Sequence, residues 1–323
     1  MPKSYNQFGI KPTAQLGIKK NTPKLPPIST GIHSIDIGSG SGGLPRGRIV
    51  EIYGYNSVCK TIIALHTVAA AQKTGIACYI DADHAIDTKF VQRFNVNPDT
   101  LLVAQPETAE DTFELIKALI KSNEIDLIVL DSIAALVPKE ELSMDLAYPP
   151  IGLQSQAIQI GLEQISGLLI KSKTSLLIIN QVRHKIIKNG YKIVSANSRS
   201  VGMYASIRII IKKLGNILEK WDPAGIMASV SIIKNTKSIS TRETRLDILF
   251  KTGISRNAEI LDLGIQFNLI NRNGNWYEYN KINLGQGRIN SSIFIGNNPD
   301  IAQKILTNVY YTFFNTVKNR QEF

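Results

Sequence analysis

The chain has 323 residues, a net charge of +11 and 43% hydrophobic residues, enough for a sizeable core and roughly two domains. This composition excludes a disordered chain, a collagen-like fibre and a small disulfide scaffold, and no apolar run reaches the ~18 residues of a membrane span. Because the chain has only Cys59 and Cys78 and no apolar leader segment, we expect reduced thiols, a cytoplasmic location and no membrane partner.

Positive charge is concentrated in two segments. Residues 1–30 hold five lysines and no acid, and residues 164–218 hold ten Lys or Arg and no acid. The first segment, with its scattered Pro and Gly, is typical of an extended basic arm. One interpretation of the second segment is that it faces a polyanion, because a bias toward solubility would interleave the two signs of charge. The alternative is a general bias of the composition toward Ile, Asn and Lys.

The central part of the chain alternates short apolar runs with longer amphipathic ones. Strands are predicted at 48–53, 77–80, 101–104 and 127–130, and helices at 62–72, 89–94 and 109–122. This rhythm predicts βαβ units and a parallel sheet covered on both faces. Further strands are predicted at 175–180, 204–211, 228–233 and 245–250, and short elements and turns past Gly253 predict a smaller second domain.

The segment between the first predicted strand and helix matches a phosphate-binding loop, GxxxxGK[ST]. It reads Gly54, Tyr55, Asn56, Ser57, Val58, Cys59, Lys60, Thr61. In such a loop the backbone N–H groups cradle phosphates, Lys60 reaches the β- and γ-phosphates, and the Thr61 hydroxyl holds Mg²⁺. Cys59 replaces the second glycine, and a left-handed backbone there would cost ~1–2 kcal/mol. The alternative to nucleotide binding is an ordinary strand–loop–helix.

Two aspartates follow predicted strands. Asp131 ends the apolar run LIVLD, where a second-shell Mg²⁺ ligand belongs in phosphate-loop enzymes. Asp83 follows CYID and is a candidate general base for the attacking water. Either residue is also typical of a turn, and Asp83 of a helix N-cap.

Longer segments match a known family. They are STGIHSIDIGSGSGGLPRGRIVEIYG, YIDADHAID, LLVAQPET, DLIVLDSIAALVPKEEL, LLIINQVRHKI, EILDLGIQFNLI, GNWYEYN and LGQGRIN. From about Gln7 to Phe314 the chain closely resembles the bacterial RecA recombinase family. The resemblance implies a short basic arm over residues 1–32, truncated relative to the family's polymerisation helix. It also implies an ATPase and DNA-binding core with a mostly parallel sheet over 33–255, and a small α/β domain over 256–323.

The function implied by this resemblance is an ATP-dependent helical filament on single-stranded DNA. Such a filament pairs with homologous duplex DNA and exchanges strands in recombinational repair, with ATP and Mg²⁺ bound between adjacent subunits. A self-cleaving repressor of the SOS response is a further partner that the resemblance suggests.

The family's ATP residues carry over position by position. Lys60, Thr61 and Asp131 match the ATP–Mg²⁺ positions, while Asp87 and Phe90 match those that contact the adenine. Three further positions have implied catalytic roles: Asp83 replaces the catalytic glutamate, Gln181 senses the γ-phosphate, and Lys234 reaches the neighbouring subunit's ATP.

Two DNA loops are implied, around residues 143–152 and 182–202. The candidate DNA-binding residues are Arg183, Lys185, Asn197, Ser198, Arg199, Arg208 and, in the last domain, Arg288. Trp276 and Tyr277 resemble a base-stacking platform, but we expect them in the core of the small domain.

Several positions depart from the family pattern: Cys59, Asp83, Gln156, Glu163, Met203 and Thr236. They favour a second hypothesis, a decayed relative that binds or coats DNA with little or no ATP turnover. A third hypothesis is a ring-forming helicase motor or clock protein with the same core, and INQVR and the GNWYEYN–LGQGRIN region argue against it.

Overall fold

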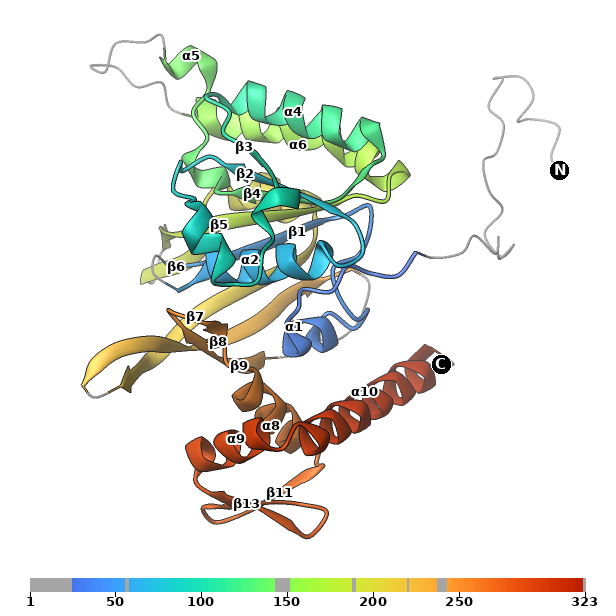
Figure 1. The fold of residues 1–323 in the computed structure, drawn as a ribbon. Helices are drawn as coiled ribbons and strands as arrows, with labels where there is room; N and C mark the ends of the chain where they lie inside the picture. The colour runs from blue at the N-terminus through green and yellow to red at the C-terminus, as the bar shows by residue number, and fades with distance from the viewer. Residues whose placement is uncertain are drawn as a thin grey trace, which may run out of the picture.

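The computed structural model describes residues 25–55, 58–142, 152–187, 190–219, 221–236 and 243–321. Within these ranges a large sheet has the strand order β10-β9-β8-β7-β1-β5-β4-β2-β3, with β6 paired to β5 (Figure 1). The strands that form its parallel half are β1 (Ile49–Gly54), β2 (Ile76–Asp81), β3 (Leu102–Ala104), β4 (Ile125–Asp131) and β5 (Ser175–Ile187). The predicted α/β fold with a mostly parallel sheet is confirmed.

The other half of the sheet is mainly antiparallel. β7 (Ala205–Glu219) runs parallel to β1, and β8 (Asp222–Asn235), β9 (Glu243–Leu249) and β10 (Gly253–Ile254) follow in antiparallel pairs. β6 (Gly190–Ser195) folds back on the extended end of β5. β7 and β8 are longer than predicted, because their paired ends carry exposed polar residues such as Lys212 and Lys213 that leave no apolar run.

Helices cover both faces of the sheet. One face packs against α2 (Lys60–Ala71) and α3 (Thr88–Gln92), and the other against α4 (Ala109–Ser122) and α6 (Leu153–Lys171). In β5, Leu177 and Ile179 belong to the first core and Leu176 and Ile178 to the second. Successive side chains of a strand point to opposite faces, so a strand buried on both sides becomes a continuous apolar run. The remaining core helices are α1 (His33–Gly38), α5 (Lys139–Leu142) and α7 (Ser198–Tyr204).

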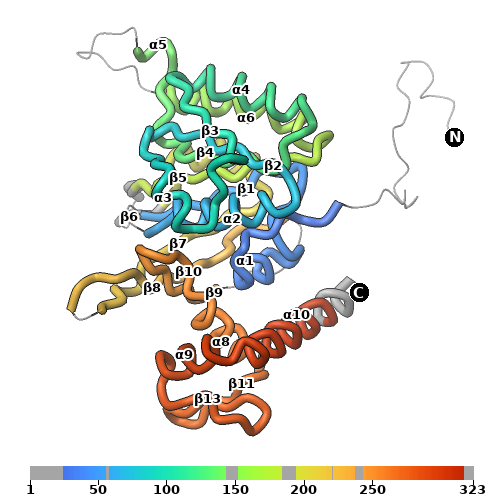
Figure 2. The backbone as a smooth tube through the Cα atoms, in the orientation of Figure 1, coloured from blue at the N-terminus to red at the C-terminus, as the bar shows by residue number. Residues whose placement is uncertain are grey.

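A small domain follows the sheet. It comprises α8 (Arg256–Gln266), the antiparallel strands β11 (Ile270–Asn273), β12 (Trp276–Tyr279) and β13 (Ile282–Gln286), and the helices α9 (Arg288–Asn297) and α10 (Pro299–Gln321). Figure 2 shows it below the large sheet, with α1 between them. Ile37 of α1 joins its core, and Ser34 donates two hydrogen bonds to Glu259 of α8.

The expectation for the two aromatic residues of β12 is half right. Tyr277 is buried in the small domain, but Trp276 is 48% exposed. The correction follows from strand geometry, because neighbouring side chains on β12 point to opposite faces and only one of those faces is covered.

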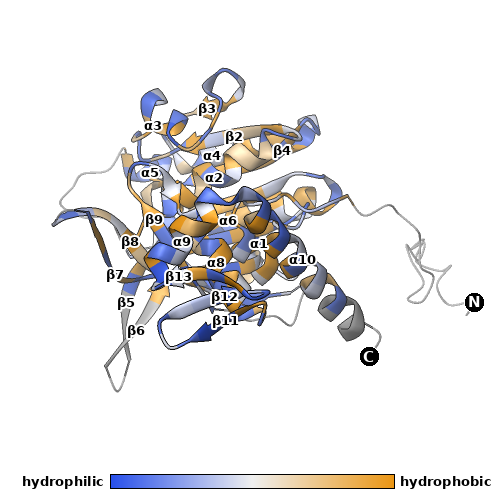
Figure 3. Cartoon of the chain, turned by 60° about the horizontal axis from the view of Figure 1, so that its bottom comes forward, coloured by the Kyte–Doolittle hydropathy of each residue, from blue (hydrophilic) through white to orange (hydrophobic). Residues whose placement is uncertain are grey.

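Hydrophilic and hydrophobic residues are interspersed along helices such as α6 (Figure 3). Among the described residues no helix has the length and apolar character needed to cross a bilayer.

Candidate functional site

The candidate phosphate loop connects β1 to α2. Lys60 begins α2, and its ammonium donates hydrogen bonds to the carbonyl oxygens of Gly54 (3.1 Å) and Tyr55 (2.8 Å). Gly54 has no room for a side chain, since a Cβ there would lie 2.5 Å from the Ile211 carbonyl oxygen. Val58 is buried in the core, while Asn56 and Ser57 lie outside the described residues. A lysine at a helix N-terminus after a parallel strand has the arrangement expected for phosphate binding.

Cys59 adopts the left-handed conformation (φ 58°, ψ 35°) that its place in the motif suggested. A residue with a Cβ is strained there by about 1 kcal/mol relative to glycine. Burial raises the pKa of its thiol, although Lys60 opposes that shift.

Replacing Cys59 with glycine is expected to increase the free energy of unfolding by about 1 kcal/mol and to tighten ATP binding. The physical reason is that glycine adopts the left-handed conformation without strain. It also has no Cβ to obstruct the approach of the ATP phosphates to the loop backbone. Denaturant unfolding and ATP titration measure the two effects. Cys59→Ala is the control, because it removes the thiol and keeps the Cβ. Unchanged affinity in Cys59→Gly would show that the Cβ does not obstruct the loop.

Thr61 and Asp131 lie together as a magnesium site requires. The Thr61 hydroxyl donates to Asp131 Oδ2 at 2.7 Å, and the buried Tyr79 hydroxyl donates to the same oxygen at 2.7 Å. Burial raises the pKa of Asp131, and the hydrogen bonds from Tyr79 and Thr61 oppose this shift. A hydroxyl next to a carboxylate suits Mg²⁺, which takes few protein ligands and completes its shell with phosphate oxygens and water. The sequence analysis missed Tyr79, because its contact depends on the pairing of β2 with β4.

Asp83 lies in a turn after β2 that a second aspartate holds in place. The buried Asp81 accepts hydrogen bonds from the backbone N–H groups of Ala85 (3.1 Å) and Ile86 (3.0 Å), and from Gln105 Nε2 (3.0 Å). Ser132 Oγ lies 3.4 Å from Asp83 Oδ2. Partial burial raises the pKa of Asp83, and the nearby Lys60 opposes that shift. The structure therefore brings Asp83 toward Lys60 and Asp131, and Asp81 is a positioning residue that the sequence reasoning overlooked.

Asp87 and Phe90 have local structural contacts. Asp87 caps α3 by accepting a hydrogen bond from the Lys89 N–H at 3.2 Å, and Phe90 packs edge-on against Phe94 with ring centroids 5.1 Å apart. A contact of either residue with adenine stays a prediction.

Gln181 and Lys234 lie in different places. Gln181 of β5 pairs in register with Gly54 at the start of the phosphate loop. Lys234 of β8 donates to the carbonyl oxygens of Gly202 (2.8 Å) and Met203 (3.3 Å) near the end of α7. Burial lowers the pKa of Lys234. Of these two residues, therefore, only Gln181 lies beside the phosphate loop of its own chain.

The candidate DNA residues of the second loop differ in exposure. Arg183 and Arg199 are exposed, and Ser198 begins α7. Asn197 directly precedes α7 in a left-handed conformation (φ 50°) without a side-chain capping hydrogen bond, and its Oδ1 accepts a hydrogen bond from Ser155 Oγ at 2.6 Å. The Lys185 side chain and residues 143–151 of the first loop lie outside the described part of the chain.

The two remaining arginines are paired within the protein. Arg208 Nε donates to the buried Glu51 at 2.5 Å. Arg288 contacts both carboxylate oxygens of Asp262 (3.0 and 2.6 Å) and also forms an ion pair with Asp247. A DNA phosphate would have to compete with these carboxylates, so DNA contact by either arginine stays a prediction.

A mostly parallel sheet with a lysine at the start of α2 and a threonine–aspartate pair beside it is the core of a phosphate-loop ATPase. A family model of the RecA N-terminal domain matches residues 2–255, and one of the RecA C-terminal domain matches residues 258–313. The chain belongs to the RecA family.

Several curated proteins, each named Protein RecA, are similar to this chain along most of its length. That of Syntrophus aciditrophicus is 40% identical over 301 residues, which cover 93% of this chain and 88% of the relative. That of Rhodospirillum rubrum is 40% identical over 300 residues (92% and 82%), and that of Citrifermentans bemidjiense 38% over 307 residues (94% and 91%). The similarity supports a RecA-like recombinase and does not favour the hypothesis of a decayed DNA-coating relative. Membership of the family implies ATP and DNA binding and filament formation.

Proposed function

We propose that this chain hydrolyses ATP with Mg²⁺ while assembled as a filament on single-stranded DNA, and that this cycle drives pairing and strand exchange with a homologous duplex. The observation that carries the proposal is the hydrogen bond of 2.7 Å between Thr61 and Asp131, next to Lys60 at the N-terminus of α2. In phosphate-loop enzymes, such an arrangement binds the nucleotide phosphates and Mg²⁺ next to a lysine ammonium.

Each residue has a separate task in this proposal. Lys60 exchanges the Gly54 and Tyr55 carbonyls for phosphate oxygens. The Thr61 hydroxyl would bind Mg²⁺, Asp131 would support it through its hydrogen bond with Thr61, and the ion would neutralise charge at the phosphates. Asp83 accepts the proton of the water that attacks the γ-phosphorus, as the bond to the ADP oxygen breaks. Arg183 and Arg199, both exposed, contribute to the DNA surface.

Two further expectations from the family stay proposals. One is the division into residues 1–32, 33–255 and 256–323, which limited proteolysis tests. The other is a self-cleaving repressor as a partner of the filament, which a cleavage assay with the assembled filament tests.

The experiment that tests the function is ATP hydrolysis with and without single-stranded DNA, at low and at moderate salt. Strong stimulation by DNA is expected, and it should weaken with salt because phosphate contacts release counterions. DNA binding without any turnover would overturn the proposal and restore the hypothesis of a protein that only coats DNA.

Replacing Gln181 with alanine is expected to abolish the ATP-dependent increase in affinity for single-stranded DNA. Gln181 lies beside Gly54 on one side, and its carbonyl accepts the Ala196 N–H (2.8 Å) on the other, so its backbone holds it between the phosphate loop and the second DNA loop. Alanine keeps these backbone contacts and removes only the side-chain amide. DNA affinity is measured with ATP and with no nucleotide. The control is Gln164→Ala on the exposed face of α6. An unaffected increase would show that Gln181 does not transmit the signal.

A further inference from the structure

We propose that Glu51 is a positioning residue that fixes both ends of the segment 195–203 relative to Gln181, and so carries the nucleotide signal to the DNA surface. This inference rests on the proposed function, because it deepens the coupling between ATP and DNA.

The Glu51 carboxylate is fully buried in the centre of the sheet. Its Oε1 accepts a hydrogen bond from Asn180 Nδ2 (2.9 Å), and its Oε2 accepts one from Arg208 Nε (2.5 Å). Asn180 belongs to β5 and Arg208 to β7, the two strands that flank β1. One carboxylate therefore joins all three strands.

Both partners of Glu51 also contact the start of the segment 195–203, which belongs to the second DNA loop and is called the DNA segment below. Arg208 Nη2 donates to Ser195 Oγ at 2.9 Å, and Asn180 Nδ2 also donates to the Ala196 carbonyl at 2.7 Å. In turn, Asn180 Oδ1 accepts the N–H of Gln181 at 2.8 Å. The same amide group thus contacts Glu51, the DNA segment and the proposed γ-phosphate sensor.

The far end of the segment lies against the same arginine. A Cβ on Gly202 would be 3.0 Å from Arg208 Nη1, so the backbone of α7 passes close to the guanidinium. Lys234, opposite Arg208 in the sheet, holds the Gly202 carbonyl, and the guanidinium lies over the Tyr53 ring at 5.2 Å. Because residues 195–196 and 202 contact one cluster of side chains around Arg208, we expect the whole segment 195–203 to move together with Gln181.

A buried ion pair of this kind adds little net stability, because desolvation of the charges offsets their attraction. Removing one partner alone leaves an unpaired buried charge and is destabilising, whereas replacing both with apolar residues of similar volume is tolerated. The test therefore uses Glu51→Gln together with the double variant Glu51→Met/Arg208→Met.

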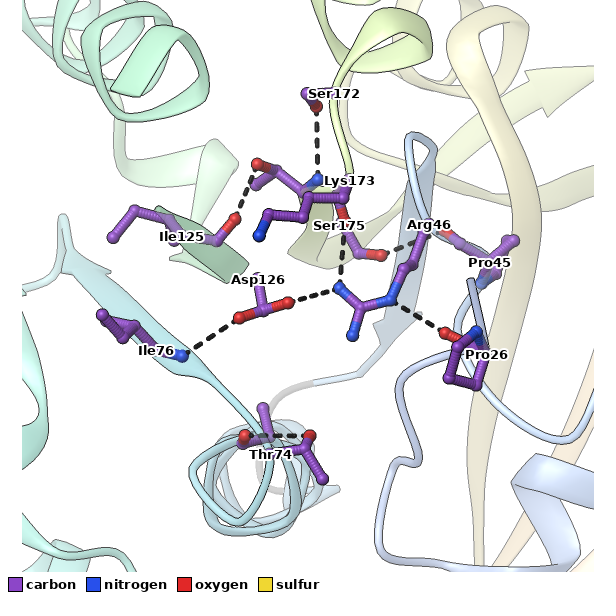
Figure 4. Close-up of polar contacts among 12 residues, drawn as sticks. Pro26, Pro45, Arg46, Thr74, Ile76, Ile125, Asp126, Ser172, Lys173 and Ser175 are labelled. Carbon is purple, nitrogen blue, oxygen red and sulfur yellow. Dashed lines mark hydrogen bonds and ion pairs between the residues drawn. The ribbon is translucent and has the colours of Figure 1, made fainter. Parts of the chain in front are cut away.

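Asp126→Asn is the matched control. Asp126, near the start of β4, forms a partly buried ion pair with Arg46 (2.5 Å), among the Pro26, Lys173 and Ile76 backbone groups shown in Figure 4. The Asp126→Asn substitution also disrupts a pair between an arginine and a carboxylate, but at a place that does not contact the segment 195–203.

Three quantities are measured in the full chain: Mg·ATP affinity, affinity for single-stranded DNA with and without ATP, and hydrogen exchange of the amides of residues 196–203. We expect both Glu51 variants to bind ATP as the parent does. The ATP-dependent gain in DNA affinity should be at least about tenfold smaller than in the parent, and hydrogen exchange of these amides should be faster. The control should keep the gain.

Other outcomes overturn the inference. If Arg208 acts only as a direct DNA contact, Glu51→Gln frees its charge, raises DNA affinity without nucleotide and keeps the gain. Unchanged hydrogen exchange in the double variant also contradicts a positioning role. If the parent protein itself shows no ATP-dependent gain, the proposed function fails, and the exchange measurement alone still decides whether Glu51 positions the segment.

Discussion

Replacing Asp83 with asparagine is expected to lower the rate of ATP hydrolysis by about 10²- to 10⁴-fold and to leave the affinity for ATP unchanged. The amide cannot accept the proton of the attacking water, but it keeps the size of the side chain and its contact with Ser132. The affinity is retained because Lys60 and the start of α2, rather than Asp83, hold the phosphates in the proposed mechanism.

The rate should also depend on pH in a defined direction. Partial burial raises the pKa of Asp83, so in the proposed mechanism the parent protein loses its base as the pH falls through that raised value, at a higher pH than for a free aspartate. Steady-state turnover at saturating ATP and DNA, followed over pH, measures both effects. Asp83→Glu is the control, because it keeps the carboxylate. Equal turnover in Asp83→Asn and the parent would assign the base to another group.

The free energy of unfolding of the parent protein is expected to fall by about 3 kcal/mol as the pH rises from about 4.5 to about 7, and that of Glu259→Gln is expected not to fall in this way. Glu259 lies between α1 and α8, where Ser34 N (2.8 Å) and Ser34 Oγ (2.7 Å) donate to its Oε1. Its Oε2 is buried with no hydrogen-bond partner among the described residues, so ionisation would leave negative charge on a buried oxygen that no donor contacts. Burial raises the pKa of Glu259 from 4.5 to about 7, against the hydrogen bonds from Ser34 and the charge of Arg256.

The sign follows from linkage. The folded state binds the Glu259 proton more tightly than the unfolded state, so this contribution is complete below the unfolded pKa and is lost as the pH rises through the folded pKa. Burial also raises the pKa of the neighbouring Asp36, to about 6. The difference between the parent and the variant therefore reports the titration of Glu259 together with its charge interaction with Asp36.

Urea unfolding of both proteins at several pH values measures this difference, and the exposed Glu124→Gln is the control. The unfolding free energy of Glu259→Gln should rise relative to the parent across the window. Parallel pH profiles would mean that Glu259 does not change its protonation between the folded and unfolded states.

The sequence predicted the site best where the signal is local. Lys60 and Thr61 follow a strand and begin a helix, so the phosphate loop is recognisable from consecutive residues. The helix 109–122 was predicted with the bounds that the structure has, because Thr108 caps its start and one apolar stripe faces the core. The β7–β8 hairpin was predicted too short, since an exposed strand end has no apolar pattern to mark it.

The sequence by itself determined the α/β class, the phosphate loop and the family, because these depend on residues near one another in the chain. Only the tertiary structure decided which charges are paired. Arg208 and Glu51 are 157 residues apart, Ser34 and Glu259 are 225 apart, and Tyr79 and Asp131 are 52 apart. Composition treats each arginine as a free positive charge, yet Arg208 and Arg288 are already bound to carboxylates. Such pairs form only when the order of strands in the sheet brings distant residues together and removes them from water, and no local pattern encodes that order.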